Sequence, residues 1–108
     1  MGAAAAADVV FKALADPTRR EILTLLRERR RSVGEIASNF RVSRPAISKH
    51  LRLLRGAGLV VDHPHGTSRL CELNAEPLRQ VESWLDSYKT FWTVSLERLK
   101  AHMEEDQE

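Results

Sequence analysis

The spacing of apolar residues predicts two helices in the first 30 residues of the chain. Through residues 8–15, apolar side chains recur at helical spacing. Asp16 and Pro17 then mark the start of a second helix that runs to about residue 29. An aspartate at an N-cap accepts hydrogen bonds from free backbone N–H groups, and a proline at the first helical position has no N–H group to lose.

The next segment, residues 33–57, has the pattern of two short helices joined by a tight turn. Ser32 and Glu35 have the spacing of a capping box, in which each side chain bonds the backbone of the other residue. Ser43 is the predicted N-cap of the following helix, over residues 43–57. Its apolar stripe is Ile47, Leu51 and Leu54. We therefore predict a helix-turn-helix whose second helix has an outward face free of core residues.

After residue 58 the period of the pattern changes from helical to alternating. Residues 59–61 are apolar, residues 69–73 alternate between polar and apolar, and a glycine-containing turn lies between them. This pattern predicts a β-hairpin over residues 59–73. Asn74 is positioned to cap a final helix over about 75–102. The order α-α-α-α-β-β-α is that of a mainly α-helical winged helix, which we expect to form one domain over residues 1–108.

Composition excludes several classes of protein. Hydrophobic residues make up 43% of the chain and charged residues 30%, which is typical of a folded domain and not of a disordered or collagen-like one. No apolar run approaches the roughly 20 residues that a membrane span needs. Cys71 is the single cysteine, so it has no partner for an internal disulfide. We expect a cytoplasmic protein with no membrane partner.

The small net charge of +2 conceals a separation of charge along the chain. No carboxylate occurs between Ile36 and Val61, while that stretch holds several arginines and a lysine. Such a basic segment attracts polyanions, and Arg, Lys and Ser side chains can bond phosphates or base edges. The tip of the wing, with His63, His65 and Arg69, is suited to phosphate or minor-groove contact. The candidate DNA-binding residues are Ser43, Arg44, Pro45, Ser48, Lys49, Arg52, His65 and Arg69.

These segments resemble a known family over residues 10–73. The stretches FKALADPTRREILTLL, SVGEIASNFRVSRPAISKHLRLLRGAGLV and HPHGTSRLCELN are similar to the ArsR/SmtB family of winged-helix repressors. The resemblance implies a homodimer that represses transcription until an effector releases it from operator DNA. It also implies base-facing roles for Arg44, Pro45, Ser48 and Lys49, and a wing role for Arg69.

The chain differs from the metal-sensing members of the ArsR/SmtB family at the positions of their metal ligands. The thiolate motif would fall at Ser32, Gly34 and Ala37, and the zinc site at Ala75, Pro77, Tyr88 and Phe91. None of these residues is a suitable ligand. We therefore predict no metal site and no cofactor. His50 is expected to serve in packing and hydrogen bonding, and Cys71 to be structural. No nucleophile triad, phosphate loop or dinucleotide turn occurs, so we expect no enzymatic activity.

The predicted final helix carries apolar residues on more than one side, more than one small domain can cover. Such surfaces mark interfaces, and a twofold dimer is the commonest arrangement. A dimer would place two recognition helices about 34 Å apart, to match a palindromic operator. The predicted interface residues are Val10, Leu14, Leu78, Val81, Leu85, Tyr88, Trp92 and Leu99. Two alternatives stay open: a winged helix that binds protein, and a ligand-gated sensor with an aromatic pocket at the dimer interface.

Overall fold

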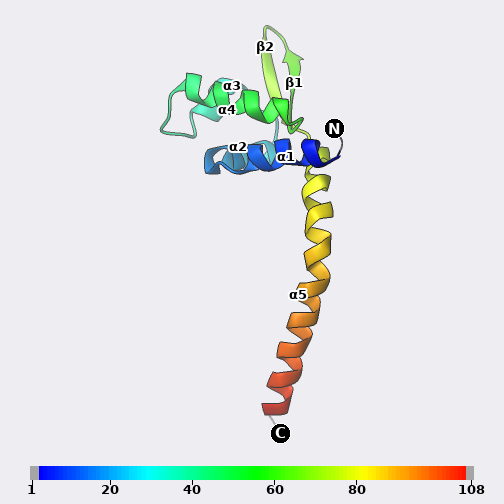
Figure 1. Cartoon of the computed structure of the whole chain (residues 1–108). Helices are drawn as coiled ribbons and strands as arrows, with labels where there is room; N and C mark the ends of the chain where they lie inside the picture. Colours follow the sequence, from blue (N-terminus) through cyan, green and yellow to red (C-terminus); the bar gives the residue numbers. More distant parts are fainter. Residues whose placement is uncertain (1–2, 107–108) are drawn as a thin grey trace.

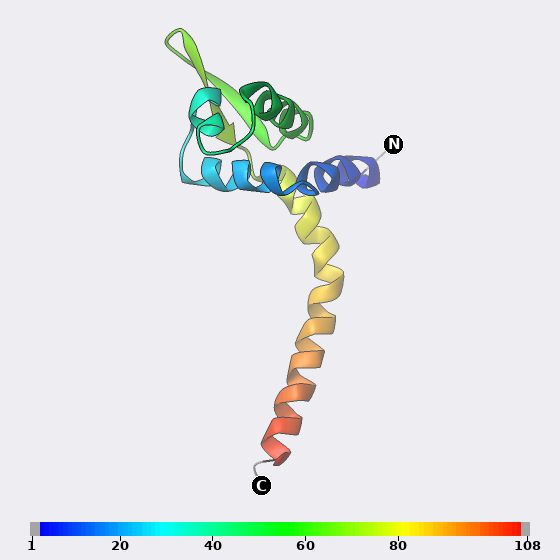
Figure 2. The ribbon, with the colours of Figure 1, turned by 90° about the vertical axis from the view of Figure 1, so that its left-hand side faces the viewer.

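Helices and one β-hairpin follow one another in the predicted winged-helix order in the computed structural model, which describes residues 3–106. The elements are α1 (Ala3–Leu14), α2 (Pro17–Glu28), α3 (Val33–Ala37), α4 (Arg44–Gly56), β1 (Val60–His65), β2 (Ser68–Leu73), the 3₁₀ turn η1 (Glu76–Leu78) and α5 (Arg79–Asp106). The elements before η1 form a head, and α5 projects away from it as a single long helix (Figures 1 and 2).

Local capping bonds start the helices at the predicted residues. The Oδ1 atom of Asp16 accepts hydrogen bonds from the backbone N–H groups of Thr18, at 2.8 Å, and Arg19, at 3.3 Å. The capping box at the start of α3 is complete, because Ser32 and Glu35 each bond the backbone of the other at 3.1–3.2 Å. Both predicted helix starts are therefore confirmed.

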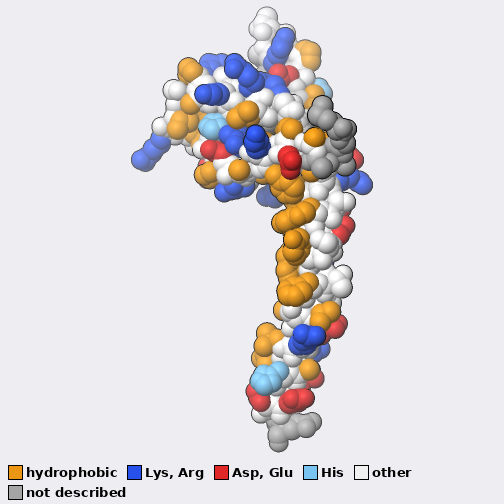
Figure 3. Space-filling view, in the orientation of Figure 1, with side chains coloured by type: hydrophobic (Ala, Val, Ile, Leu, Met, Phe, Trp, Pro, Cys, Tyr) orange, Lys and Arg blue, Asp and Glu red, His pale blue; other side chains and the backbone are white. Residues whose placement is uncertain are grey.

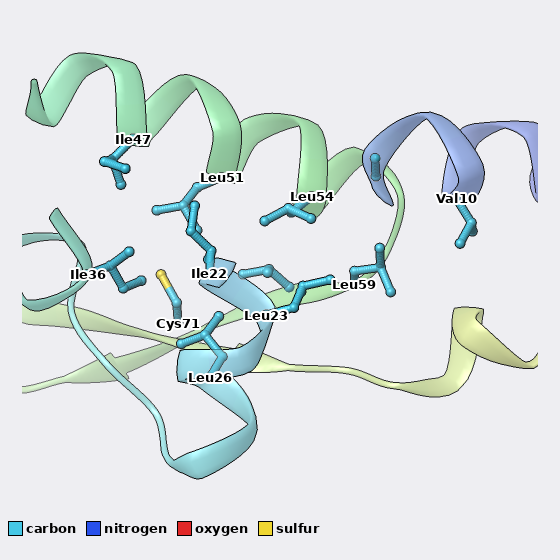
Figure 4. Close-up of a cluster of buried hydrophobic side chains, with 12 residues drawn as sticks. Val10, Ile22, Leu23, Leu26, Ile36, Ile47, Leu51, Leu54, Leu59 and Cys71 are labelled. Carbon is cyan, nitrogen blue, oxygen red and sulfur yellow. The ribbon is translucent and has the colours of Figure 1, made fainter. Parts of the chain in front are cut away.

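The core of the head lies between α2, α3, α4 and the start of the wing. The three residues of the predicted α4 stripe, Ile47, Leu51 and Leu54, are fully buried. Figure 4 shows them facing residues of α2, with Cys71 entering the same cluster from β2. Burying this apolar surface is the main force that holds the helix-turn-helix together.

The structure corrects the predicted dimer interface at Val10, which is a core residue of the head. Its side chain is 2% exposed and belongs to the core cluster of the head, because α1 packs on α2 and α4. It is therefore covered within one chain and has no surface to offer a second copy. Leu14, Leu78 and Val81, three other predicted interface residues, are half-buried and pack against the same core.

The hairpin forms as predicted, with one addition. β1 and β2 pair antiparallel, with His65 opposite Ser68 and a tight turn between them. Gly66 begins this turn at φ +61°, in the left-handed region that favours glycine. The addition is Arg31, which follows α2. Its N–H donates to the carbonyl of Cys71 at 3.1 Å, and the N–H of Cys71 donates back at 2.7 Å. Arg31 thus forms an isolated antiparallel β-bridge with Cys71 at the free edge of β2, and the sheet itself keeps two strands.

The final helix begins later than the pattern predicts. Asn74 does not cap α5: its Oδ1 accepts from the N–H of Glu76 at 3.3 Å, and its Nδ2 donates to the carbonyl of Gly58 at 2.9 Å. The Asn74 side chain therefore joins the short η1 turn to Gly58, just after the end of α4. The α-helix starts at Arg79 and continues to Asp106. None of the helices in residues 3–106 combines the length and the apolar character needed to cross a membrane.

Candidate nucleic-acid interface

The outward face of α4 presents the residues that the sequence singles out. Ser43 caps the helix by accepting from the N–H of Ala46 at 3.3 Å. The side chains of Arg44, Pro45, Lys49 and Arg52 are exposed, and Ser48 is half-buried. Since Ile47 and its stripe turn the opposite face into the core, this face is open to solvent along the helix. Figure 3 shows Lys and Arg side chains gathered on the head.

Five exposed cations in α4, in the turn before it and in the wing have no acidic partner among the described side chains. We define the free basic set as Arg41, Arg44, Lys49, Arg52 and Arg69. Among the side chains that the structure describes, none of the five lies within ion-pair distance of a carboxylate. Cations that have no carboxylate partner supply the counterion-release term that dominates binding to a phosphate backbone. The free basic set can therefore bind a polyanion without first breaking ion pairs within the protein.

Arg44 lies where the two helices of the motif meet. A Cβ atom added to Gly34, near the start of α3, would lie 3.9 Å from the Cζ atom of the Arg44 guanidinium. The Arg44 side chain therefore passes beside the first turn of α3. A cation at this place can contact DNA next to both helices of the motif.

Arg55 differs from the free basic set, although it lies in the same carboxylate-free stretch. Its Nε atom is 3.0 Å from Oδ2 of Asp62 in β1, and one of its terminal nitrogens is 3.8 Å from Sγ of Cys71. Its charge is used to join α4 to the wing. The sequence alone does not distinguish Arg55 from the unpaired arginines near it. Its partner Asp62 lies in β1, and the two side chains meet only because of how the turn after α4 folds.

His63 does not lie at the wing tip, which corrects the prediction. It pairs with Leu70 in the middle of the hairpin, and its Nε2 atom contacts the carboxylate of Glu72. Arg30 binds the same carboxylate at 3.0 Å. The hydrogen bond with His63 and, to a smaller extent, the one with Arg30 hold the pKa of Glu72 below its ordinary value. His65 and Arg69 are exposed near the turn, as expected for a wing tip.

The remaining candidate ligand residues are engaged inside the fold. Nδ1 of His50 lies 3.2 Å from a terminal nitrogen of Arg19, which confirms its expected hydrogen-bonding role. Cys71 is 1% exposed, and burial, with the nearby charge of Asp62, raises the pKa of its thiol. No group of three or more His, Cys, Asp or Glu side chains in the described part of the chain is arranged to hold a metal ion.

Outside the head, α5 exposes a long apolar face. Figure 3 shows hydrophobic side chains following one side of this helix. Tyr88, Trp92 and Leu99 of the predicted interface are 45–54% exposed, while Leu85 is half-buried. Further large exposed apolar side chains of α5 are Trp84, Phe91, Val94, Leu96 and Met103. Several apolar residues in one row on a free helix predict a partner surface.

The start of this face is joined to α1 by aromatic contacts. The ring of Trp84 meets that of Phe11 edge to face, with centroids 5.5 Å apart, and lies 5.1 Å from the ring of Tyr88. Edge-to-face pairs of this kind are favoured by the charge distribution of aromatic rings. The contact between Phe11 and Trp84 therefore joins the first turns of α5 to α1 of the head.

Comparison with known proteins shows that the sequence is similar to bacterial transcriptional regulators. The family model described as "Bacterial regulatory protein, arsR family" matches residues 16–61. The HTH-type transcriptional regulator Rv2034 of Mycobacterium tuberculosis is 44% identical over 89 residues, covering 82% of this chain and 80% of that protein. The transcriptional repressor SdpR of Bacillus subtilis is 42% identical over 76 residues, covering 70% and 84%.

Solved structures agree with the fold. An ArsR-like transcriptional regulator from Rhodococcus sp. RHA1 superposes with a TM-score of 0.74 at 34% identity, covering 93% of this chain and 94% of that one. A domain from Mycobacterium bovis has a TM-score of 0.63 at 27% identity, covering 88% and 82%. It is described as a homodimeric winged helix-turn-helix DNA-binding domain of a possible ArsR-family regulator.

Proposed function

The chain belongs to the ArsR family of bacterial regulatory proteins, and from this premise we propose that it is a homodimeric repressor whose two α4 helices read a palindromic operator. The observation that carries this proposal is the free basic set, which lies on α4, in the turn before it and on the wing. The homologous SdpR, itself described as a repressor, supports the direction of regulation.

The proposed contacts follow from the position of each side chain. A major groove accepts one α-helix, and the N-terminal residues of that helix come closest to the base edges. In this proposal Arg44 and Lys49 bond guanine O6 and N7, and the hydroxyl groups of Ser43 and Ser48 bond base edges or phosphates. Arg52 lies one turn further along, where the backbone passes. His65 and Arg69 would hold the phosphates beside the wing.

The proposed dimer forms through α5. The apolar face of this helix is uncovered in one chain, and burying it against a second copy removes apolar surface from water. A twofold axis at α5 would place the two heads symmetrically and give an operator with matching half-sites. The domain from Mycobacterium bovis, similar over 88% of this chain, is described as homodimeric, which supports the proposal of a dimer.

The experiment that tests this function is selection from a random duplex library. Purified full-length protein is incubated with the library, bound DNA is amplified, and the stoichiometry of the selected complex is measured by light scattering. We expect a palindromic sequence bound by two chains. Recovery of unrelated sequences with no shared half-site would contradict the proposal and favour the protein-binding alternative.

A further inference from the structure

One arginine side chain joins the start of α2 to two other helices. Nε of Arg19 donates to the carbonyl of Ala13 at 2.7 Å, and Nη2 donates to the carbonyl of Lys12 at 3.0 Å. Both carbonyls belong to the end of α1. The third nitrogen, Nη1, lies 3.2 Å from Nδ1 of His50 in α4. A single guanidinium therefore links α1, α2 and the recognition helix.

The chemistry of each partner makes this link directional. The last carbonyls of a helix have no partner within the helix, and a cation is favourable there. The end of α1 thus holds Arg19 through two of its donors. Because a guanidinium can only donate, Nδ1 of His50 must be the unprotonated ring nitrogen and must accept. The Asp16 carboxylate fixes the origin of the side chain by accepting from the N–H of Arg19 at 3.3 Å.

Apolar packing leaves a gap between α1 and α4 beside this link. A partly open hollow of about 190 Å³ is lined by Val9, Lys12, Ala13, Arg19 and Leu53. Val9 of α1 and Leu53 of α4 are 46% and 51% exposed, so they do not close it. Apolar side chains do not fill this space between α1 and α4. Arg19 connects the two helices beside it, through the carbonyls at the end of α1 and through His50.

We propose that Arg19 and His50 act as positioning residues that set the orientation of α4 relative to α1. This inference rests on the proposed operator-reading function. The edge-to-face contact of Phe11 with Trp84 ties α1 to α5, so the link runs from the proposed dimer helix to the recognition helix. Two recognition helices must enter successive grooves at a fixed separation, which makes specific binding sensitive to their orientation. Non-specific binding depends on charge and has no such requirement.

The test uses variants of both partners in the full-length dimer. His50→Asn keeps an acceptor near the Nδ1 position, while His50→Leu removes it. Arg19→Lys keeps the charge but loses the planar fork that reaches three acceptors. We expect His50→Leu and Arg19→Lys to weaken binding to the selected operator on the order of tenfold. His50→Asn should bind within about twofold of wild type.

Three further readouts separate positioning from other roles. Affinity for a non-operator duplex, and the slope of affinity against salt concentration, should be unchanged in all variants, because neither residue contacts phosphate. The double variant Arg19→Lys with His50→Leu should be no weaker than the weaker single variant, since the two residues act through each other. Unfolding curves and light scattering establish that each variant is a folded dimer; should His50→Leu not fold, Arg19→Lys and His50→Asn still decide.

Two results would overturn the inference. The first is operator binding equal to wild type in folded Arg19→Lys. The second is an equal loss for operator and non-operator DNA with a reduced salt slope, which would make His50 or Arg19 a direct phosphate contact. A wild-type protein that selects no DNA sequence would instead refute the proposed function, and the two failures are thereby distinguished.

Discussion

Nε of Arg55 in α4 lies 3.0 Å from Oδ2 of Asp62 in β1, and the two side chains are only 35% and 23% exposed. The pair joins the end of the recognition helix to the beginning of the wing. It also removes Arg55 from the cations that are free to meet DNA, although this residue belongs to the same basic stretch as Lys49 and Arg52.

The first prediction separates these two kinds of arginine. Arg55→Ala should lower the free energy of unfolding by about 1–2 kcal/mol, because it leaves the carboxylate of Asp62 partly buried without its partner. It should leave the salt slope of DNA binding unchanged. Arg52→Ala, the matched control, should leave the free energy of unfolding unchanged and should reduce the salt slope of DNA binding. Urea unfolding and DNA titration over a salt series measure both quantities; a reduced slope for Arg55→Ala would contradict the assignment.

The second prediction concerns the thiol of Cys71. Because burial raises its pKa and the side chain is 1% exposed, the native protein contains little accessible thiolate. Alkylation by iodoacetamide at pH 8 should be at least about tenfold slower in the native protein than in urea. Mass spectrometry of timed samples measures the two rates. Equal rates would show that the wing opens readily or that the thiol is not buried.

The third prediction is a loss of stability in acid. Glu35 accepts from the N–H of Ser32 and binds Arg29 at 3.0 Å, and these contacts, in that order, hold the pKa of its carboxyl below the ordinary value. The folded state therefore binds this proton less readily than the unfolded state. The stabilising contribution is present at neutral pH and is lost as the pH falls below about 4.5, through the lowered pKa of the folded state. Urea midpoints between pH 7 and pH 3 should show this loss.

Glu35→Gln identifies the group responsible. Glutamine can complete a capping box but carries no titrating charge, so the variant should show a smaller change between pH 5 and pH 3. Glu97→Gln, on the exposed surface of α5, serves as the control and should behave as wild type. The same acid response in Glu35→Gln and wild type would assign the loss to other carboxylates, such as Asp16 or Glu72, whose pKa values are also lowered.

The fourth prediction concerns assembly. Leu85→Asp and Trp92→Asp place a charge on the apolar face of α5, where a partner helix would have to desolvate it. Each variant should shift the protein from dimer to monomer and weaken operator binding, as measured by sedimentation equilibrium and titration. Thr90→Asp, which adds the same charge at an exposed polar position of α5, should remain dimeric. A dimer of unchanged stability in Trp92→Asp would place the interface elsewhere.

The features that local sequence specifies were predictable. The caps at Asp16 and Ser32 and the buried stripe of α4 depend on residues within one or two turns of each other, and the sequence pattern predicts all of them. Features that depend on distant partners were not predictable. The bridge from Arg31 to Cys71 spans 40 positions, and the contact between Arg19 and His50 spans 31.

The errors have the same origin. The apolar spacing around Val10 shows that one face of the helix is buried, but not whether its own chain or a second copy covers it. The hairpin pattern likewise leaves His63 in the predicted turn, because the alternation does not show that β1 continues to His65 and pairs His63 with Leu70. In both cases the missing information is a tertiary contact, and the residue's type and spacing are compatible with either outcome.

Titration of the selected operator over a salt series is the measurement that tests the central claim most directly. Wild type is compared with Lys49→Ala and Arg44→Ala on α4, and with Arg98→Ala, an equal loss of charge on the exposed surface of α5. The account predicts that each α4 variant weakens operator binding by about 1–3 kcal/mol, while Arg98→Ala matches wild type. Operator affinities that are the same in all four proteins would contradict α4 as the helix that reads DNA.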